Sequence, residues 1–433
     1  MTGRCLTWAM VLGLSVSWAA PGLAVDRKTI LAIEQEIDLL APELVKVRRY
    51  LHLNPELGFQ ETATSSILRS KLAAQGFEVN AVPPSPGFAA VLRGRSSGLT
   101  VALAVAMDGL PLQEKSGSAF KSLKPGVMHA GGNDIHMAIA LGTALVLRTF
   151  RDDLQGSVKF IFHPGSEGGP SGQKQGAKLM IKNGVLLNPP VGVVLGLQVV
   201  PLKLGDVQVS AGAVTASADR FIITIQGRPS SAGQPQAGQD AVAIASQVIT
   251  SLQQVLSPSR NSDPSAMLTI GQVQAGTHPS LVAEQARLEG TVLTLGAGRH
   301  LKVRRIIEDA VRGVCQAFGA ASAVEFLEET PPVINHPQLA KNLNSVLTGL
   351  LGARHILPAK QQMFAEDFAF FSSQVPGYFI LLGSQPSPSP SASPPFSPGF
   401  SPDEKSIPVG VKIMCHLILE CLEQQKLLEN RLP

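Results

Sequence analysis

The sequence predicts an α/β protein in two folded parts: a large domain built on a mostly parallel β-sheet, and a smaller α+β domain inserted into it. Helix-like stretches separate three apolar runs, which cover residues 99–107, 158–162 and 191–197. Continuous apolar strands between helices are typical of a parallel sheet that is buried on both faces. Between residues 214 and 328 the pattern changes to alternating strands and amphipathic helices. This change indicates a separate two-layer unit.

The first 24 residues are predicted to be a secretory signal peptide and not part of the fold. Arg4 is their single charged residue, an apolar run covers residues 6–20, and Gly22-Leu23-Ala24 supplies small residues for cleavage. The apolar run is shorter than the ~20 residues that a membrane-spanning helix needs. We therefore expect a periplasmic or secreted protein with no membrane span.

The large domain is assigned to residues 25–213 and 329–433. Apolar residues at helical spacing, such as Ile67, Leu68 and Leu72, predict its helices. Its elements are expected, in order, as helices at 28–60 and 62–75, strands at 99–107, 158–162 and 191–197, then a strand at 378–382 and a helix at 409–428. Residues 384–402 are so rich in Pro and Ser that an extended surface loop is expected there.

The inserted domain, residues 214–328, shows the element order β-α-β-β-α-β. Its elements are expected as a strand at 221–226, a helix at 240–255, strands at 267–273 and 287–295, a helix at 303–318 and a strand at 323–326. In the first helix Ala241, Ile244, Val248 and Leu252 fall on one face. This order is that of a split βαβ domain with two layers.

Composition excludes several classes of protein. With 44% apolar and 16% charged residues the chain can bury a large core. The net charge is only +4, and Lys and Arg are scattered, so no basic patch for nucleic acid is predicted. Cleavage of the leader would leave three cysteines, Cys315, Cys415 and Cys421. An odd set implies no disulfide framework, and buried, small apolar residues are the expected role.

Four segments resemble the zinc aminoacylase and carboxypeptidase family, in its branch of bacterial and plant N-acyl-amino-acid amidohydrolases. They are RRYLHLNPELGFQET from Arg48, MDGLPLQE from Met107, PGVMHAGGNDIH from Pro125 and MFAEDFAFFSSQVPGYFILLG from Met363. They occur in the family's order and span essentially all of the mature chain. The resemblance implies a metallopeptidase-like α/β domain, with the inserted domain acting as a lid and dimerisation domain.

The same resemblance implies two zinc ions held by five side chains, with a glutamate as general base on a metal-bound water. In this chain the family's Cys and His of the HACGHD segment correspond to Gly131 and Asn133. The general-base position is Ser166, and the ligand beside it is retained as Glu167. The two remaining histidine positions are Gln198 and Phe396. One ligand of five remains, so the chain looks like a degenerate member and no zinc is expected.

Positions that the family uses to hold its substrate have changed as well. The lid's Gly-Gly-His corresponds to Pro229-Ser230-Ser231. The Asn and the Arg that are expected near a substrate carboxylate correspond to Ser280 and Leu293. An Arg and an Asp of the family's first strand segment correspond to Ala104 and Ala106. A shifted register that hides an intact site is disfavoured, because Gly132, Asp134 and Gly196-Leu197 align with the family without gaps.

Several polar residues are still expected near the carboxyl ends of the parallel strands. They are Asp108, His129, Asp134, His136 and Glu167. These residues are candidates for binding a ligand, and their oxygen donors would suit a hard cation such as Mg or Ca. In the alternative interpretation they only orient loops around the former site. Glu366 and Asp367 are expected to accept backbone N–H groups at a helix start.

Two further chemistries are disfavoured by the sequence around Ser166. The segment PGSEGG lacks the Gly-x-Ser-x-Gly elbow of a serine hydrolase, and the nearest histidine is His163. The glycines of residues 165–172 are not followed by the Gly-Lys-Ser/Thr of a phosphate-binding loop.

Two functions therefore remain open from the sequence. The first is a non-catalytic binding or regulatory pseudoenzyme that takes a small acyl or amino-acid-like ligand and forms a homodimer through its lid. The alternative is an active amidohydrolase or peptidase on N-acyl amino acids with an altered metal site.

Overall fold

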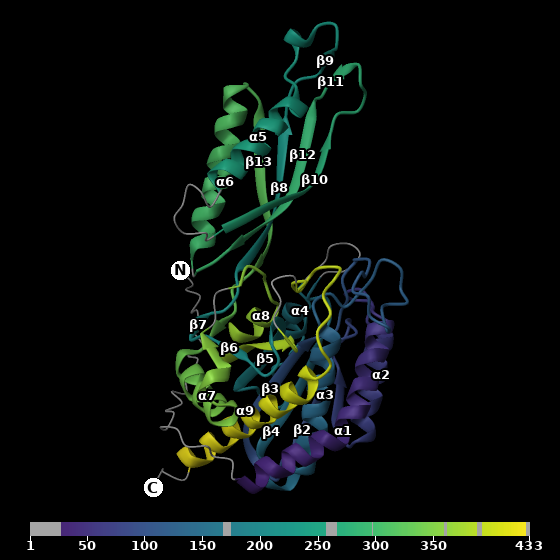
Figure 1. Ribbon diagram of the computed structural model, residues 1–433. Helices are drawn as coiled ribbons and strands as arrows, with labels where there is room; N and C mark the ends of the chain where they lie inside the picture. Colours follow the sequence, from purple (N-terminus) through teal and green to yellow (C-terminus); the bar gives the residue numbers. More distant parts are fainter. Residues whose placement is uncertain are drawn as a thin grey trace, which may run out of the picture.

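The structure, a computed structural model, describes residues 27–167, 175–256, 266–296, 298–358, 362–387 and 392–429. The predicted signal peptide lies outside these residues. Figure 1 shows a large α/β domain joined to a smaller domain through a narrow connection. No helix within the described ranges is both long enough and apolar enough to cross a bilayer.

The large domain is built on an eight-stranded sheet. In spatial order its strands are β1 (Glu78–Ala81), β2 (Phe88–Arg93), β4 (Gln155–His163), β3 (Ser96–Ala106), β5 (Val193–Lys203), β16 (Gly377–Gln385), β6 (Val207–Val209) and β15 (Ile356–Pro358). The central pairs β4–β3, β3–β5 and β5–β16 are parallel, as is β6–β15. The predicted, mostly parallel sheet is confirmed. The sequence did not predict the antiparallel edge formed by β1 and β2.

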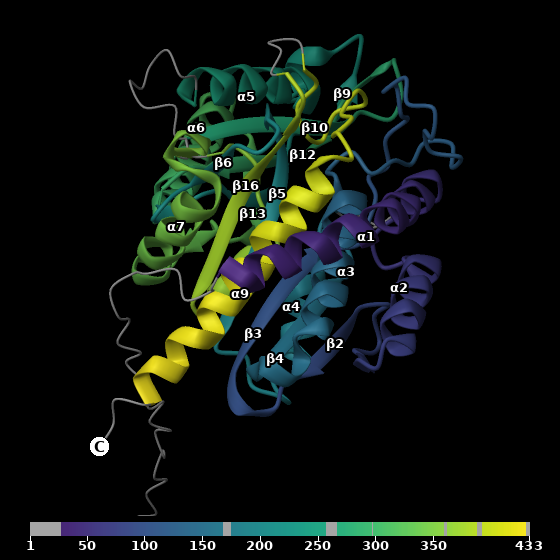
Figure 2. The same ribbon diagram turned by 60° about the horizontal axis from the view of Figure 1, so that its bottom comes forward.

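Helices cover both faces of this sheet, which explains its unbroken apolar strands. One face packs against α1 (Arg27–Leu53), α2 (Thr62–Ala74), α3 (Asn133–Thr149), α7 (Pro337–Leu351) and α9 (Ser406–Glu429). The other packs against the short helices α4 (Gly176–Lys182) and α8 (Phe368–Ser372). Alternate residues of β3 point to opposite sides: Leu103 belongs to the first core, and Ala102 and Ala104 belong to the second. In Figure 2, α1 and α9 cross in front of the sheet.

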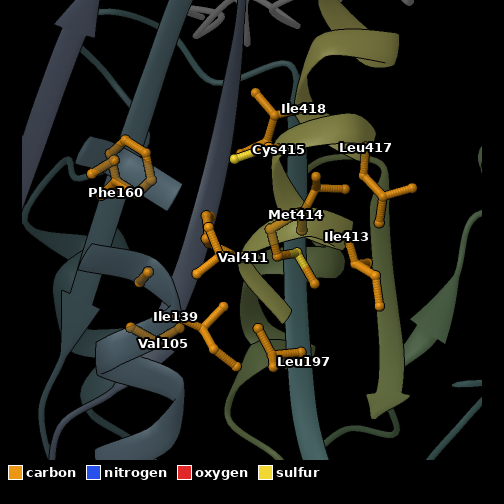
Figure 3. Close-up of a cluster of buried hydrophobic side chains, with 14 of the residues drawn as sticks. Val105, Ile139, Phe160, Leu197, Val411, Ile413, Met414, Cys415, Leu417 and Ile418 are labelled. Atoms are coloured by element: carbon orange, nitrogen blue, oxygen red, sulfur yellow. The ribbon is translucent and has the colours of Figure 1, made fainter. Parts of the chain in front are cut away.

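The larger core lies between the sheet and α3 and α9. Figure 3 shows Val105, Ile139 and Leu197 beside Val411 and Met414. All of these side chains are almost completely buried. Cys315, Cys415 and Cys421 are free and buried, and burial is the role that the sequence analysis expects for them.

The first helix of the large domain is shorter than predicted. The first helix ends at Leu53 and not at residue 60, because Pro55 disfavours a helical conformation for Asn54. The remaining short elements are η1 (Arg151–Asp153) and η3 (Ala353–His355), with β7 (Gly212–Ala213) paired to β14 (Ile334–Asn335) beside the connection to the smaller domain.

The smaller domain has the element order that the sequence predicts. The elements are β8 (Ser217–Gln226), α5 (Ala241–Val255), β10 (Ala266–Ala275), β12 (Gln285–Thr294), α6 (Arg299–Ala317) and β13 (Ala321–Thr330), with the short β9 (Ser230–Ser231), η2 (Pro235–Ala237) and β11 (Leu281–Val282). The four long strands form an antiparallel sheet in the order β10-β12-β8-β13. Both helices pack on one face of it through residues such as Ile244 and Ile307. The opposite face of the sheet is left without helices (Figure 1).

Candidate functional site

The candidate site lies where three strands of the large sheet end. β3 leads into Asp108, β4 leads into residues 164–167, and Gln198 lies within β5. Asn133, the first residue of α3, closes the site from the side. Because β3, β4 and β5 are parallel neighbours, their carboxyl ends meet at one edge of the sheet. Open α/β sheets bind their ligands at such edges.

At Gly131, where the resemblance places a metal-binding cysteine, a side chain would meet two neighbours. A Cβ atom added to Gly131 would lie 2.6 Å from Oε1 of Glu167 and 3.2 Å from Cε1 of Phe396. Real Cβ atoms essentially never approach another heavy atom to within 3.0 Å, so the flexible end of Glu167 would have to shift. Position 131 therefore offers no metal ligand, and the carboxylate of Glu167 and the ring of Phe396 lie close to the place where one would begin.

The backbone around Phe396 holds its ring in this place. Its φ angle of 65° lies in the left-handed region, which residues other than glycine rarely adopt. The N–H of Phe396 donates to the carbonyl of Ala130 at 2.8 Å, and its ring lies 5.5 Å from that of Phe364. Phe400 is completely buried. In its described residues 392–402, the predicted surface loop therefore also packs against the domain through its two phenylalanines.

Asn133, at the family's histidine position, bonds to the protein itself. Its Nδ2 donates to the carbonyl of Asp108 at 2.9 Å, and its Oδ1 lies 3.1 Å from Nδ1 of His136. Nε2 of His136 accepts the N–H of Val199 at 3.0 Å, which places the ring proton on Nδ1. Burial lowers the pKa of His136 to about 4, so this histidine is neutral at pH 7.

Gln198, at another histidine position, ties β5 to the loop before α3. Its Nε2 donates to the carbonyl of Gly131 at 2.7 Å and to that of Val199 at 3.1 Å. The side chain is 1% exposed. An amide nitrogen carries no lone pair for a metal, and here it is already committed to two carbonyl groups.

Asp108 fixes the loop that carries Ser166 and Glu167. Its two carboxylate oxygens accept the backbone N–H groups of these residues at 3.1 Å and 2.7 Å. Beside it, Glu61 accepts the N–H of Gly165 at 2.8 Å. Burial, together with the charge of Asp108, raises the pKa of Glu61 to about 8, so this carboxyl group is protonated at pH 7.

A buried cluster of charges lies behind α3. Oδ2 of Asp134 is 2.7 Å from Nε of Arg48 and 2.9 Å from Nδ1 of His52, and Nε2 of His52 is 3.2 Å from Oε1 of Glu114. Burial opposes charge on His52, but Asp134 and Glu114 outweigh it and raise the pKa to about 9. Burial likewise opposes charge on Asp134, yet Arg48 and His52 hold its pKa far below the usual range. His129 lies next to this cluster, 6.4 Å from His52, and burial lowers its pKa to about 4.

Arg48, His52, Glu61 and Glu114 were not singled out from the sequence. Their signal was present, because they belong to the segments from Arg48 and from Met107 that carry the family resemblance. In the structure these segments form the ion cluster and the support for the 164–167 loop, and the four side chains do not line the ligand cavity.

The cavity itself lies between the open face of the smaller domain's sheet and the candidate site. Its volume is about 510 Å³, within the range of pockets for small molecules. Six positions that the sequence analysis named line it: Ser166, Glu167, Leu293, Glu366, Asp367 and Phe396. Its other walls comprise Leu110, Met363, Phe364 and Ala365 from the large domain and Ala218, Arg220, Thr291 and Thr330 from the smaller one.

Four of the five predicted ligand-binding residues lie below the floor of this cavity. Asp108, His129, Asp134 and His136 are at most 3% exposed and do not line it. A ligand in the cavity would meet Glu167 but not these four side chains. Their contacts are with loops and with the ion cluster instead.

Glu366 and Asp367 begin the short helix α8, as their sequence context predicts. Oε1 of Glu366 accepts the N–H of Phe368 at 3.4 Å, and Oδ2 of Asp367 accepts the N–H of Ala177 at 3.2 Å. Burial, followed by the charge of Asp108, raises the pKa of Glu366 to about 7.

The side chains present do not fit a two-zinc centre. Within the part of the chain that the structure describes, no three His, Cys, Asp or Glu side chains are placed to hold one metal ion. Gly131 offers no thiolate, and the amides of Asn133 and Gln198 are bonded to the protein. A hard-cation site built from Asp108, Asp134 and Glu167 is disfavoured for the same reason, since Asp108 and Asp134 are already bonded to backbone groups and to Arg48.

Comparison with known proteins confirms the resemblance. The sequence profile described as peptidase family M20/M25/M40 matches residues 102–420. The chain belongs to this family. It is 36% identical over 376 residues to a probable hydrolase of Synechocystis, covering 86% of this chain and 94% of that one. It is 35% identical over 343 residues to the N-acetylcysteine deacetylase of Bacillus subtilis, covering 79% and 88%.

Solved structures of M20 relatives share the fold. A dinuclear metal-binding peptidase of the M20 family from Bacillus subtilis is 31% identical, with a TM-score of 0.74 over 89% of this chain and 99% of that one. An aminohydrolase structure from methicillin-resistant Staphylococcus aureus, 27% identical, has a TM-score of 0.78 over 90% and 99%. This chain is therefore a homologue of amidohydrolases and peptidases, with the α/β architecture that the sequence predicts.

Proposed function

We propose that this chain is a non-catalytic member of the M20 family, with a binding or regulatory role. The observation that carries the proposal is the space around Gly131. Position 131 has no side chain to bind a metal, and Oε1 of Glu167 and Cε1 of Phe396 lie 2.6 Å and 3.2 Å from the point where one would begin. The amides at two further ligand positions, Asn133 and Gln198, donate to carbonyl groups of the protein itself.

The general-base position supports the same conclusion. Hydrolysis of an amide by a metallopeptidase needs a Lewis acid and a base that takes a proton from water. Ser166 stands at the base position, and its neutral hydroxyl is too weakly basic to take a proton from water. The loop that carries it is fixed by the two N–H bonds to Asp108.

The cavity of about 510 Å³ gives such a protein a place to bind a small molecule. An acyl or amino-acid-like compound is the ligand class that the family implies, and the N-acetylcysteine deacetylases among the relatives act on compounds of this size. The competing function is hydrolysis of N-acyl amino acids by an altered metal site.

Hydrolysis assays decide between the two functions. We expect the mature protein to release no acetate from N-acetylcysteine or other N-acetyl amino acids, either alone or with added zinc or manganese. The N-acetylcysteine deacetylase of Bacillus subtilis, assayed beside it, is the positive control. Metal-dependent turnover by this chain above the buffer rate would establish the competing function.

Export and dimerisation complete the proposal. The leader-like first 24 residues support a periplasmic or secreted location. β10 is an edge strand of the smaller domain's sheet, and it exposes Met267 and Val273 by about half. Edge strands with apolar side chains pair readily with a second copy. Light scattering should therefore show a homodimer that becomes a monomer with Met267→Lys and Val273→Lys, while Leu187→Lys on the large domain has no effect. A wild-type monomer at tens of micromolar would contradict this.

A further inference from the structure

We infer that the cavity between the two domains binds a ligand with a medium-length linear alkyl chain, and that this chain leaves the cavity along one row of the smaller domain's sheet. The row consists of Ala218 of β8, Leu293 of β12 and Met267 of β10. The inference rests on the proposed function, because it treats the cavity as the ligand site of a binding protein. It narrows the acyl or amino-acid-like ligand to one with a longer acyl chain.

Strand register places these three side chains next to one another on the open face of the sheet. Leu293 is the Cα partner of Met267 on one side and of Ala218 on the other. Residues directly opposite each other on neighbouring strands point to the same face of a sheet. The adjacent residues Val292 and Leu268 pack in the core under the helices, so Leu293 and its two partners point away from that core.

The row continues the cavity wall to the edge of the sheet. Ala218 and Leu293 line the cavity, and Met267 lies one strand further out. Met267 is 50% exposed, although its side chain is large and apolar. From Ala218 to Met267 the row spans two interstrand spacings, roughly 10 Å. An extended octanoyl chain has about this length, so it would cover the row from the cavity to the edge.

A polar row runs beside the apolar one and fixes the path of the chain. It consists of Arg220 of β8, Thr291 of β12 and Thr269 of β10, which are partners in the same ladders. An alkyl chain over this row would take hydroxyl groups out of water without bonding them, which is unfavourable. Over Leu293 and Met267 the chain covers apolar side chains instead, and burial of apolar surface favours binding.

Calorimetric titration of the mature protein with a series of N-acyl-L-alaninamides tests the inference. The acetyl, octanoyl and decanoyl compounds share one uncharged head group, so the series measures the chain alone. We expect the octanoyl compound to bind at least about tenfold more tightly than the acetyl compound, because each methylene that leaves water strengthens binding by up to about fourfold. Because β10 is the edge strand, the row ends at Met267. The decanoyl compound should therefore gain less than about twofold over the octanoyl compound.

Two variants of the edge strand separate this row from the rest of the surface. Met267→Ser should weaken binding of the octanoyl compound by about fivefold and leave binding of the acetyl compound unchanged. Val273→Ser is the matched control. Val273 lies on the same strand and is 51% exposed, but its partner Leu288 belongs to the core under the helices, so Val273 points to the opposite face. Any effect that acts through pairing of β10 with a second copy would appear in both variants.

The outcomes separate this inference from the proposed function. Equal affinities for the acetyl and octanoyl compounds, or no binding of any compound, would overturn the inference and leave the non-catalytic function standing. Equal losses in Met267→Ser and Val273→Ser would also overturn it, and would indicate that a second copy of the chain covers this edge. Affinity that keeps rising at the same rate from octanoyl to decanoyl would show unspecific association and overturn it as well. Metal-dependent hydrolysis of N-acetyl amino acids would instead refute the function itself.

Discussion

The buried cluster of Arg48, His52, Glu114 and Asp134 should make the stability of the fold depend on pH. Replacing His52 should remove this dependence. The pKa of His52 is about 9 in the folded protein, against 6.5 for an ordinary histidine. Because folding raises this pKa, the imidazolium contributes stability that is fully present below pH 6.5. That contribution is lost as the pH rises through 9.

The size of the effect follows from the two pKa values. A difference of about 2.5 units at ~1.4 kcal/mol per unit gives a contribution on the order of 3 kcal/mol to the free energy of unfolding. His52 is 1% exposed, so solvent screens this contribution little. His52→Asn removes the titrating group and leaves Asp134 with Arg48 alone.

Urea unfolding of wild type and His52→Asn at about pH 6 and about pH 9.5 measures this contribution. The wild type should be more stable at the lower pH, and its advantage over the variant should shrink by on the order of 3 kcal/mol at the higher pH. His278→Asn, an exposed position on the smaller domain, is the control and should follow the wild type. A difference between wild type and His52→Asn that stays constant with pH would refute the reasoning.

The remaining predictions concern packing and buried polar groups. Gly131→Ala should lower the free energy of unfolding by only about 1 kcal/mol, because its Cβ would displace the flexible end of Glu167 and press on the ring of Phe396; unchanged stability in urea would mean that neither group is held in its place. Gly131→Cys or Asn133→His alone should restore no hydrolysis of N-acetyl amino acids, since residues that act as one unit are strongly non-additive; turnover by either variant would contradict this. Lys159→Met should lower the free energy of unfolding by on the order of 3 kcal/mol, because Nζ of Lys159 donates to the carbonyls of Val185, Leu187 and Pro189 at 2.6–3.0 Å. A thermal midpoint equal to that of the wild type would show that water replaces the ammonium group.

The sequence predicts the large elements well because their apolar patterns are unambiguous. The inner parts of β3 and β5 are buried on both faces, so residues 101–106 and 193–197 are apolar without interruption. The β-α-β-β-α-β order of the smaller domain is equally visible, because each strand and helix has one apolar face. β1 escaped prediction since it is four residues long and largely exposed, with no apolar face to detect.

The sequence predicts which metal ligands are missing from the site, but it does not predict which side chains lie there instead. Ligand positions can be read from local segments, but the contact of Glu167 and Phe396 above Gly131 joins residues more than 200 positions apart. The ion cluster likewise joins His52 to Asp134 across 82 positions. Phe396 lies among prolines and serines. Their composition predicts a loop, and it gives no sign that the ring of Phe396 packs against the domain.

Elemental analysis of the mature protein tests the central claim most directly. The chain would be purified from zinc-supplemented medium, dialysed, and analysed for metal beside the Bacillus subtilis deacetylase, and its stability would be measured with and without a chelator. We predict far less than one zinc per chain and no change in stability, because four of the five ligand positions carry no thiolate or imidazole, and the amides at two of them are bonded to the protein itself. Two tightly bound zinc ions per chain, with stability lost on chelation, would contradict the account.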